Sequence, residues 1–229
     1  MKKIRYFIEY IIISTLFVFF ELIGYQKSSN IGAKIGKVFG PMFRSKNIIK
    51  KNLENAGIKD EINQKKIIEE MWENYGRILA EYPFLKKFKT NEFKNYITIE
   101  GQEHLSEIKF KNKKAVFVSG HFNNFELMAM QLENMGIDLA AIYRPLNNFL
   151  MNKKIEKIRV NHICKKQVKK GKSGTREILK YLNQNTSIAL MIDQRVSEGK
   201  KIKFFNKLAL TTTIPAQIVS KYECAIIPI

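Results

Sequence analysis

The chain has 229 residues, 45% of them hydrophobic, so it can bury a substantial core, which argues against an intrinsically disordered protein. Its 40 Lys and Arg residues against 21 Asp and Glu residues give a formal net charge of +19, which favours anionic partners: membrane surfaces, acidic proteins or nucleic acid. Cys164 and Cys224 have no paired spacing, so neither a disulfide framework nor a zinc knuckle is indicated, and a reducing compartment fits.

The N-terminal segment, MKKIRYFIEYIIISTLFVFFELIG, opens with basic residues and becomes strongly apolar. No small-x-small cleavage site follows Phe20, so residues 1–24 are predicted to be retained as a membrane anchor. The uncharged run 10–20 is short for a span, whereas 4–24 reaches spanning length but includes Arg5, Glu9 and Glu21. A tilted spanning helix and an interfacial helix both fit, and a buried core helix is the third alternative.

Basic residues follow the anchor directly, which favours the cytoplasmic side of the membrane for the rest of the chain. They are Lys27, Lys34, Lys37, Arg44 and Lys46. Lys2 and Lys3, at the other end of the anchor, also favour the cytoplasmic side, so the basic residues at the two ends favour opposite orientations.

Residues 25–229 are predicted to form one α/β domain. Helices are expected at 31–55, 64–85, 173–185 and 212–222, and strands at 113–120, 138–144, 187–193 and 224–229. A helix-like segment also lies between the first two strands. This alternation predicts a mixed or largely parallel sheet flanked by helices. The chain stops on its last strand without a covering helix, which indicates a domain truncated at its C-terminus.

Arginine is scarce among the basic residues, so each one is expected where a planar fork of donors is needed. The candidates are Arg144, Arg159, Arg176 and Arg195. Lysines crowd the segment 165–172, which fits either a site for phosphate groups or an acidic carrier protein, or a solvated loop.

The stretch VSGHFNNFE at 118–126 carries the candidate chemistry. If a strand ends at Ser119, His121 lies at its carboxyl end, where open α/β sheets place their active sites. Asn123 is then the expected N-cap of the next helix, and Glu126 at the third helical position reaches back toward His121. A carboxylate on one imidazole nitrogen makes the other a better general base. The alternative is that Glu126 only completes a capping box.

Several short stretches follow one another in a specific order. They are KNLENAG at 51–57, NYGRILAEY at 74–82, GHFNNFE at 120–126, IYRPLNN at 142–148, GTREILKYL at 174–182, IDQR at 192–195 and FFNKLALTTTIPA at 204–216. This ordered set, with an arginine at position 159, resembles the bacterial lipid A biosynthesis acyltransferase family, the lauroyl and myristoyl transferases. That family belongs to the larger group of acyltransferases marked by His, four residues, then Asp or Glu.

The resemblance implies a membrane-anchored enzyme with a glycerolipid acyltransferase-like fold on the cytoplasmic face of the bacterial inner membrane. It would move a fatty acyl group from acyl carrier protein to a hydroxyl of a lipid A precursor. On the matching positions, His121 would be the general base and Glu126 its partner. Arg144, Arg159 and Asp193 would bind substrate or stabilise developing charge. Arg195 in IDQR departs from the family's usual pattern, which has an acidic residue or another pattern there.

Two other functions remain open. One is a glycerolipid acyltransferase of the lysophosphatidate type, although its PEGT-type motif is missing from the sequence. The other is an inactive, basic protein that binds a membrane surface or another anionic lipid. The sequence has no nucleic-acid-binding motif, so no nucleic acid partner is expected. His104, His162 and Cys164 lack metal-ligand spacing, so neither a metal nor a cofactor is expected.

Overall fold

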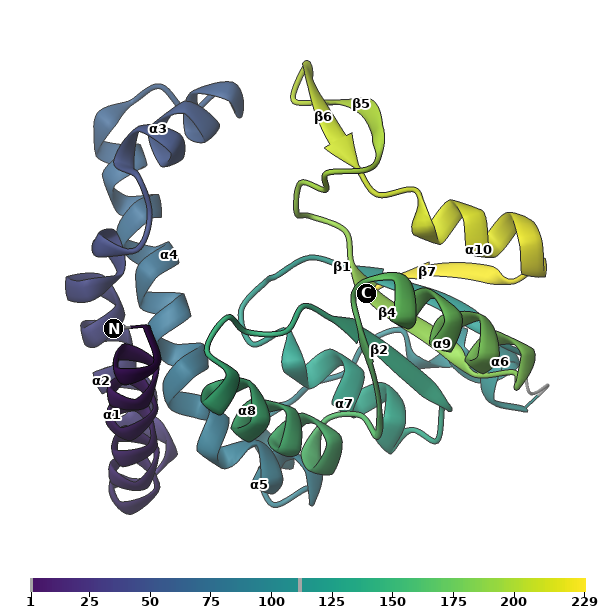
Figure 1. Ribbon diagram of the computed structural model, residues 1–229, viewed down its shortest axis with the longest axis horizontal. Coiled ribbons are helices and arrows are strands. Elements are labelled where there is room, and N and C mark those ends of the chain that lie inside the picture. The colour runs from purple at the N-terminus through teal and green to yellow at the C-terminus, as the bar shows by residue number, and fades with distance from the viewer. Residues whose placement is uncertain (1, 111–112) are drawn as a thin grey trace. The chain divides into compact units, whose positions relative to one another are not determined.

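The computed structural model describes residues 2–110 and 113–229 (Figure 1). The chain divides into two compact units. The sheet unit comprises Met1–Tyr10, Leu85–Lys200 and Thr211–Ile229, and the helical unit comprises Ile11–Phe84 and Lys201–Leu210.

The sheet unit is built on five strands in the order β3-β2-β4-β1-β7. Their bounds are Ala115–Ser119 for β1, Leu139–Tyr143 for β2, Lys166–Lys169 for β3, Ser187–Met191 for β4 and Ala225–Pro228 for β7. Each neighbouring pair is parallel, and Val116 of β1 lies opposite Ile188 of β4 and Ile226 of β7. The predicted α/β fold with a largely parallel sheet is confirmed.

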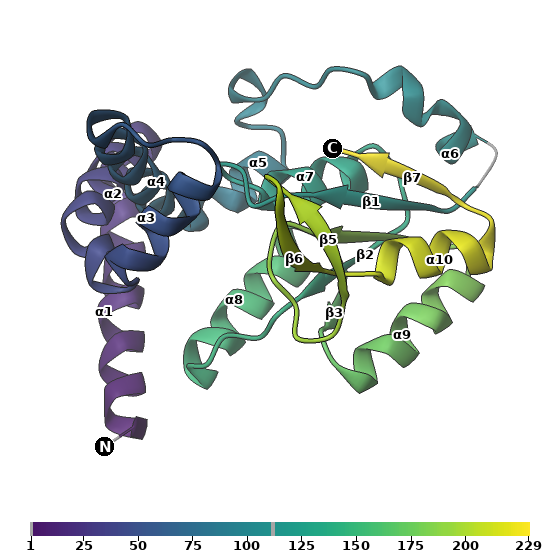
Figure 2. The same cartoon turned by 90° about the horizontal axis from the view of Figure 1, so that it is seen from above.

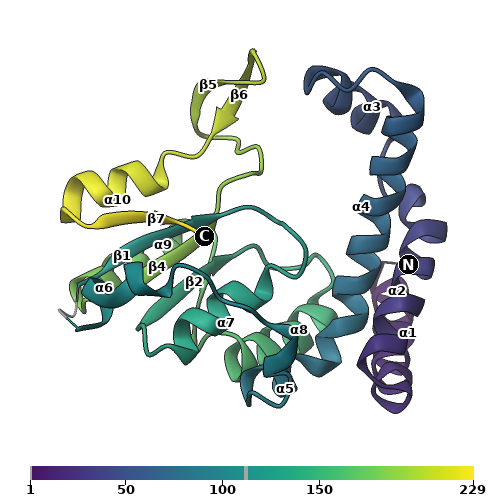
Figure 3. The same ribbon diagram turned by 180° about the vertical axis from the view of Figure 1, so that it is seen from behind.

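Helices cover the sheet on both faces (Figures 1, 2 and 3). The helices of this unit are α5 (Leu85–Lys89), η3 (Lys94–Tyr96), η4 (Gln102–Leu105), α6 (Ser106–Phe110), α7 (Glu126–Asn134), α8 (Phe149–His162), α9 (Lys172–Asn183) and α10 (Ile214–Tyr222). The crossovers through α7 and α8 run toward β3, and those through α9 and α10 run back toward β7. Because parallel crossovers are right-handed, these two pairs of helices cover opposite faces.

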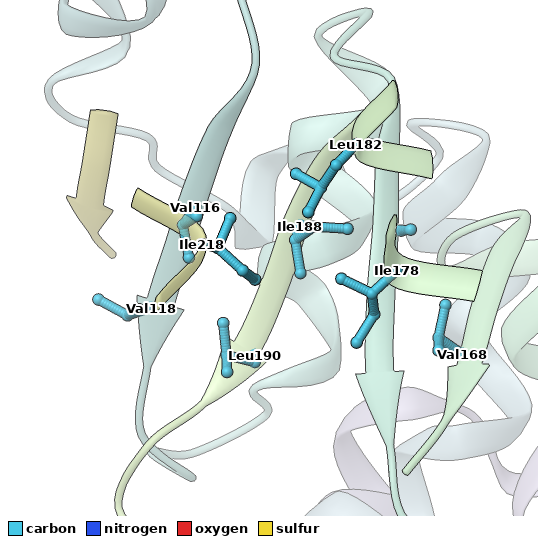
Figure 4. Close-up of a cluster of buried hydrophobic side chains, with 9 residues drawn as sticks. Val116, Val118, Val168, Ile178, Leu182, Ile188, Leu190 and Ile218 are labelled. Atoms are coloured by element: carbon cyan, nitrogen blue, oxygen red, sulfur yellow. The ribbon is translucent and has the colours of Figure 1, made fainter. Parts of the chain in front are cut away.

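The main apolar cluster lies between the sheet and the α9–α10 face (Figure 4). It joins strand residues to helix residues: Val116, Val118, Ala140, Val168, Ile188 and Leu190 from the strands, and Ile178, Leu182 and Ile218 from the helices. All five residues of β1 are buried. Phe117 alternates with Val116 and Val118 and is fully buried on the opposite face. Strand β1, which leads to His121, is therefore held by apolar packing on both sides.

The lysine-rich segment does not form the solvated loop that was one of its two interpretations. It contains strand β3, in which Val168 is fully buried. The Lys166 amine lies 2.6 Å from the Asp138 carboxylate, and the Lys169 amine lies 3.1 Å from that of Glu156. These two lysines have internal partners, so the segment is a weaker anion site than its composition suggests.

The helical unit contains α2 (Tyr25–Phe39), η1 (Gly40–Met42), α3 (Lys46–Asn55), α4 (Glu61–Glu81) and η2 (Tyr82–Phe84). The single helix expected over 31–55 is split into α2, η1 and α3, and Pro41 in η1 lacks the N–H that would continue the helical hydrogen bonds of α2. Asp60 caps α4 by accepting a 2.9 Å hydrogen bond from the backbone N–H of Asn63. This unit also contains a two-stranded ribbon that the sequence pattern did not reveal, formed by β5 (Lys200–Phe204) and β6 (Lys207–Thr211).

Glycines set the contact between α2 and α4. A Cβ atom on Gly76 would lie 2.0 Å from the carbonyl oxygen of Gly32, and one on Gly36 would lie 2.1 Å from that of Trp72. The two backbones therefore approach as closely as they do because side chains are missing at these positions.

The N-terminal helix α1 (Lys2–Ile23) leaves most of its apolar side chains exposed, including Ile4, Phe7 and Leu22. Within residues 2–110 and 113–229, it is the one helix long and apolar enough to cross a membrane. Only 17% of its most apolar stretch is buried, which disfavours the core-helix alternative. By its length and apolar composition, this helix could anchor the chain in a membrane.

Candidate active site

His121 lies just beyond the carboxyl end of β1, and Asp193 lies just beyond that of β4. These strands are parallel neighbours, so both residues are at the same edge of the sheet. The chain leaves β1 toward α7 on one face, and after β4 it reaches α10 on the other. This is a topological switch point, where open α/β sheets form a crevice for ligands.

Asp193 holds His121 through two hydrogen bonds. The His121 backbone N–H donates to Oδ2 at 2.7 Å, and the ring Nδ1 lies 2.8 Å from Oδ1. A carboxylate at Nδ1 favours the tautomer that donates from this nitrogen, which leaves the Nε2 lone pair available to accept a proton. Phe125 packs edge-on against the imidazole with ring centroids 4.7 Å apart. The ring is thus oriented by one polar contact and one aromatic contact.

The same contacts set the charge of Asp193. Desolvation alone raises its pKa, but the hydrogen bonds from the His121 backbone and ring together outweigh it, so the pKa lies below the ordinary value of 3.8. Asp193 is therefore a carboxylate at neutral pH, as required of a group that stabilises a neighbouring imidazolium.

Glu126 occupies a different place from the one its spacing predicted. Helix α7 begins at Glu126, with Phe125 in the N-cap position, so Glu126 is the first helical residue rather than the third. Asn123 has a φ of 41°, in the left-handed region, and does not cap the helix. The capping-box prediction was wrong because the left-handed turn at Asn123 delays the start of the helix. The carboxylate against the His121 ring is that of Asp193.

Glu126, which is buried, instead forms an ion pair with the partly buried Arg159 in the last turn of α8. Its Oε1 accepts from Arg159 Nε at 2.9 Å and also from Nη2. The Arg159 guanidinium lies 5.5 Å from the ring centroid of Tyr143, whose burial raises the pKa of its hydroxyl. The pair joins the first turn of α7 to the last turn of α8, and the planar arginine fork suits it better than a lysine would.

Arg144 directly follows β2, the strand on the other side of β4 from β1. Its side chain is exposed at the edge of the sheet that carries His121 and Asp193. Cys164 is buried, and desolvation raises the pKa of its thiol to about 11, so it remains a protonated thiol rather than a nucleophile. No group of three His, Cys, Asp or Glu side chains is arranged to hold a metal ion within the described part of the chain.

The five predicted site residues thus separate into two pairs and a single cation. His121 is paired with Asp193 and Glu126 with Arg159, while Arg144 lies exposed at the same sheet edge. Phe125 was missed by sequence reasoning, although its position four residues after His121 places it in the quoted motif.

The fold is an α/β fold with a histidine and a carboxylate paired at the carboxyl edge of its parallel sheet. The family model for bacterial lipid A biosynthesis acyltransferases matches residues 1–229. The chain therefore belongs to the bacterial lipid A biosynthesis acyltransferase family, and the resemblance seen in its motifs is confirmed. A comparison with curated proteins gives no significant match.

Proposed function

We propose that this acyltransferase moves a fatty acyl group from the thioester of acyl carrier protein to a hydroxyl of a lipid A precursor, in late acylation. The observation that carries the proposal is the 2.8 Å contact between His121 Nδ1 and Asp193, which leaves Nε2 as the base. Nε2 takes the hydroxyl proton while the oxygen attacks the thioester carbonyl. The tetrahedral intermediate then expels the thiolate, which recovers the proton from the imidazolium.

The other residues support this chemistry. Asp193, expected to bind substrate, acts instead as the carboxylate that orients His121 and stabilises its charged form. Glu126 and Arg159 act as positioning residues, because their ion pair fixes the helix that follows the His121 loop. Arg144 is the exposed cation that meets a phosphate of the acceptor or the acidic donor.

The charge of the chain supports the choice of partners. An acidic carrier protein and a phosphorylated lipid are both attracted by a net charge of +19. The family assignment favours the lipid A acceptor over the glycerolipid alternative.

We further propose that residues 1–24 attach the enzyme to the cytoplasmic face of the inner membrane and that 25–229 form the acyltransferase domain. Contacts of α1 favour an interfacial helix over a spanning one. The backbone oxygen of Tyr6 accepts a 2.9 Å hydrogen bond from buried Asn148, and its ring packs on Phe149 within the sheet unit. Residues 11–23 then offer about 20 Å of helix, against about 30 Å of hydrocarbon.

The proposal is tested with the full chain, acyl carrier protein loaded with a labelled acyl group, and a lipid A precursor. Mass spectrometry should find the precursor heavier by one acyl group with the wild type. His121→Ala should abolish this gain while circular dichroism and membrane sedimentation stay normal. Acylation of lysophosphatidate instead of the precursor would support the glycerolipid alternative, and transfer to neither acceptor would support a binding protein.

A further inference from the structure

The helical unit contains a pocket of about 480 Å³ that the acyl-transfer proposal does not use. Its lining comes from α2, η1, α3 and α4, all within residues 11–84. Trp72, Ile68 and Pro41 supply apolar surface. Five basic side chains and two carboxylates also line the pocket, so its basic residues outnumber its acidic ones: Lys37, Arg44, Lys46, Lys50 and Lys65 against Glu61 and Glu69. A pocket that combines apolar surface with an excess of positive charge is suited to an anion attached to an apolar body.

The cations of this pocket differ in how far they are already neutralised. The Lys37 amine lies 2.8 Å from the Glu69 carboxylate and 3.5 Å from that of Glu73. Arg44 and Lys46 are exposed, and neither forms an ion pair with any residue that the structure describes. Their charge is available to a ligand.

Exposed apolar side chains flank the pocket along the chain. Phe39 is 54% exposed, Met42 80% and Phe43 82%. They lie within the same short segment as the lining residues Pro41 and Arg44. We call Phe39, Met42 and Phe43 the apolar wedge. Large apolar side chains beside unpaired cations are typical of segments that lie at the interface between a lipid headgroup layer and water.

We propose that the pocket binds the phosphate headgroup of an anionic phospholipid while the apolar wedge enters the acyl layer of the same bilayer. Arg44 and Lys46 contact the phosphate. The indole Nε1 of Trp72, a lining residue, is buried and has no hydrogen-bond partner among the described residues. This is a second membrane contact, in addition to α1.

The chain contains a single tryptophan, Trp72, so its fluorescence reports on this pocket. The full-length protein is reconstituted in phosphatidylcholine vesicles with and without phosphatidylglycerol. Two samples of the mixed vesicles are compared. In one the phosphatidylglycerol carries brominated acyl chains, in the other an equal fraction of the total lipid is brominated phosphatidylcholine. Brominated phosphatidylglycerol should quench Trp72 more strongly than brominated phosphatidylcholine does.

Charge reversal tests the cations. Each basic residue near an anionic surface contributes roughly five-fold to partitioning, so the loss of both cations in Arg44→Glu/Lys46→Glu alone should weaken binding to phosphatidylglycerol vesicles about 25-fold, and the two added carboxylates should weaken it further. The phosphatidylglycerol-dependent quenching should fall accordingly. The control, Lys51→Glu/Lys59→Glu, makes the same change in net charge at exposed positions that do not line the pocket and should retain the quenching. Met42→Ser/Phe43→Ser tests the wedge and should also reduce quenching.

Equal quenching by the two brominated lipids would overturn the proposal. So would a folded Arg44→Glu/Lys46→Glu protein that is quenched like the wild type, or a Trp72 response that inorganic phosphate alone reproduces. Both replaced side chains are exposed, and circular dichroism verifies the fold. The readout involves no turnover, so failure here leaves the acyl-transfer proposal intact.

Discussion

His121 and Asp193 are 72 residues apart in the sequence, yet two hydrogen bonds of 2.7 and 2.8 Å join them. The neighbouring parallel strands β1 and β4 bring them together, because each residue follows the carboxyl end of its strand. The pair is therefore a consequence of strand order, and it ties the candidate chemistry to the centre of the sheet.

Replacing Glu126 with Gln should destabilise the sheet unit, because it removes the carboxylate that faces the partly buried Arg159 guanidinium. Losing a charged hydrogen-bond acceptor in this way costs about 1–3 kcal/mol. Urea unfolding monitored by circular dichroism measures the loss. Glu126→Gln/Arg159→Met removes both charges and should recover much of the stability. If Glu126→Gln alone is as stable as the wild type, the ion pair does not contribute to the stability of the fold.

Arg159→Lys tests the geometry of the same pair while keeping its charge. The lysine ammonium cannot reproduce the planar pair of N–H groups that Arg159 directs at Glu126 Oε1, so the free energy of unfolding should fall by about 1–3 kcal/mol. Lys157→Arg on α8 is a conservative control that should leave stability unchanged. Equal unfolding curves for Arg159→Lys and wild type would contradict a role for the arginine fork.

The close approach of α2 and α4 gives a prediction for the helical unit. Gly76→Ala would place a methyl group 2.0 Å from the Gly32 carbonyl oxygen, so the helices must separate. The expected cost is about 1–3 kcal/mol, as for other overpacked interiors. Glu70→Ala, on the exposed surface of α4, should change stability by no more than about 0.5 kcal/mol. If the two variants unfold alike, the helices are not as close as the structure places them.

The lowered pKa of Asp193 predicts how its contribution to stability depends on pH. A carboxyl group with a folded-state pKa below its ordinary 3.8 stabilises the fold above that value, and the stabilisation is lost as pH falls through the folded pKa. As pH falls below about 4, the stability difference between wild type and Asp193→Asn should therefore shrink. Urea unfolding at a series of pH values below 5 measures it, and a difference that keeps growing below pH 4 would contradict the lowered pKa of Asp193.

Much of the fold could be predicted because the buried strands are apolar runs. The expected strand 113–120 contains β1, and 187–193 contains β4. Strand β3 could not be predicted, because in KQVK only Val168 is buried. Because β3 has a single buried position, its sequence is mostly charged and polar and lacks the apolar pattern of a strand.

The site was predictable only in part, for a similar reason. A histidine after an apolar strand indicates a position at the carboxyl edge, and the structure confirms that position. Its polar partner depends on which strand lies beside β1, and local spacing carries no information on strand order. Glu126 was the nearest carboxylate in the sequence, whereas Asp193 is the one that strand order brings to the ring.

The central claim is that Asp193 makes His121 a general base for acyl transfer, and the turnover of Asp193→Asn tests it most directly. The amide can present an N–H to Nδ1, which would place the imidazole proton on Nε2 and remove the base. Turnover of the acyl-carrier-protein substrate should fall by about two to four orders of magnitude. Asp138→Asn, which alters a carboxylate paired with Lys166, should keep turnover near that of the wild type. A folded Asp193→Asn enzyme with wild-type turnover would contradict the account.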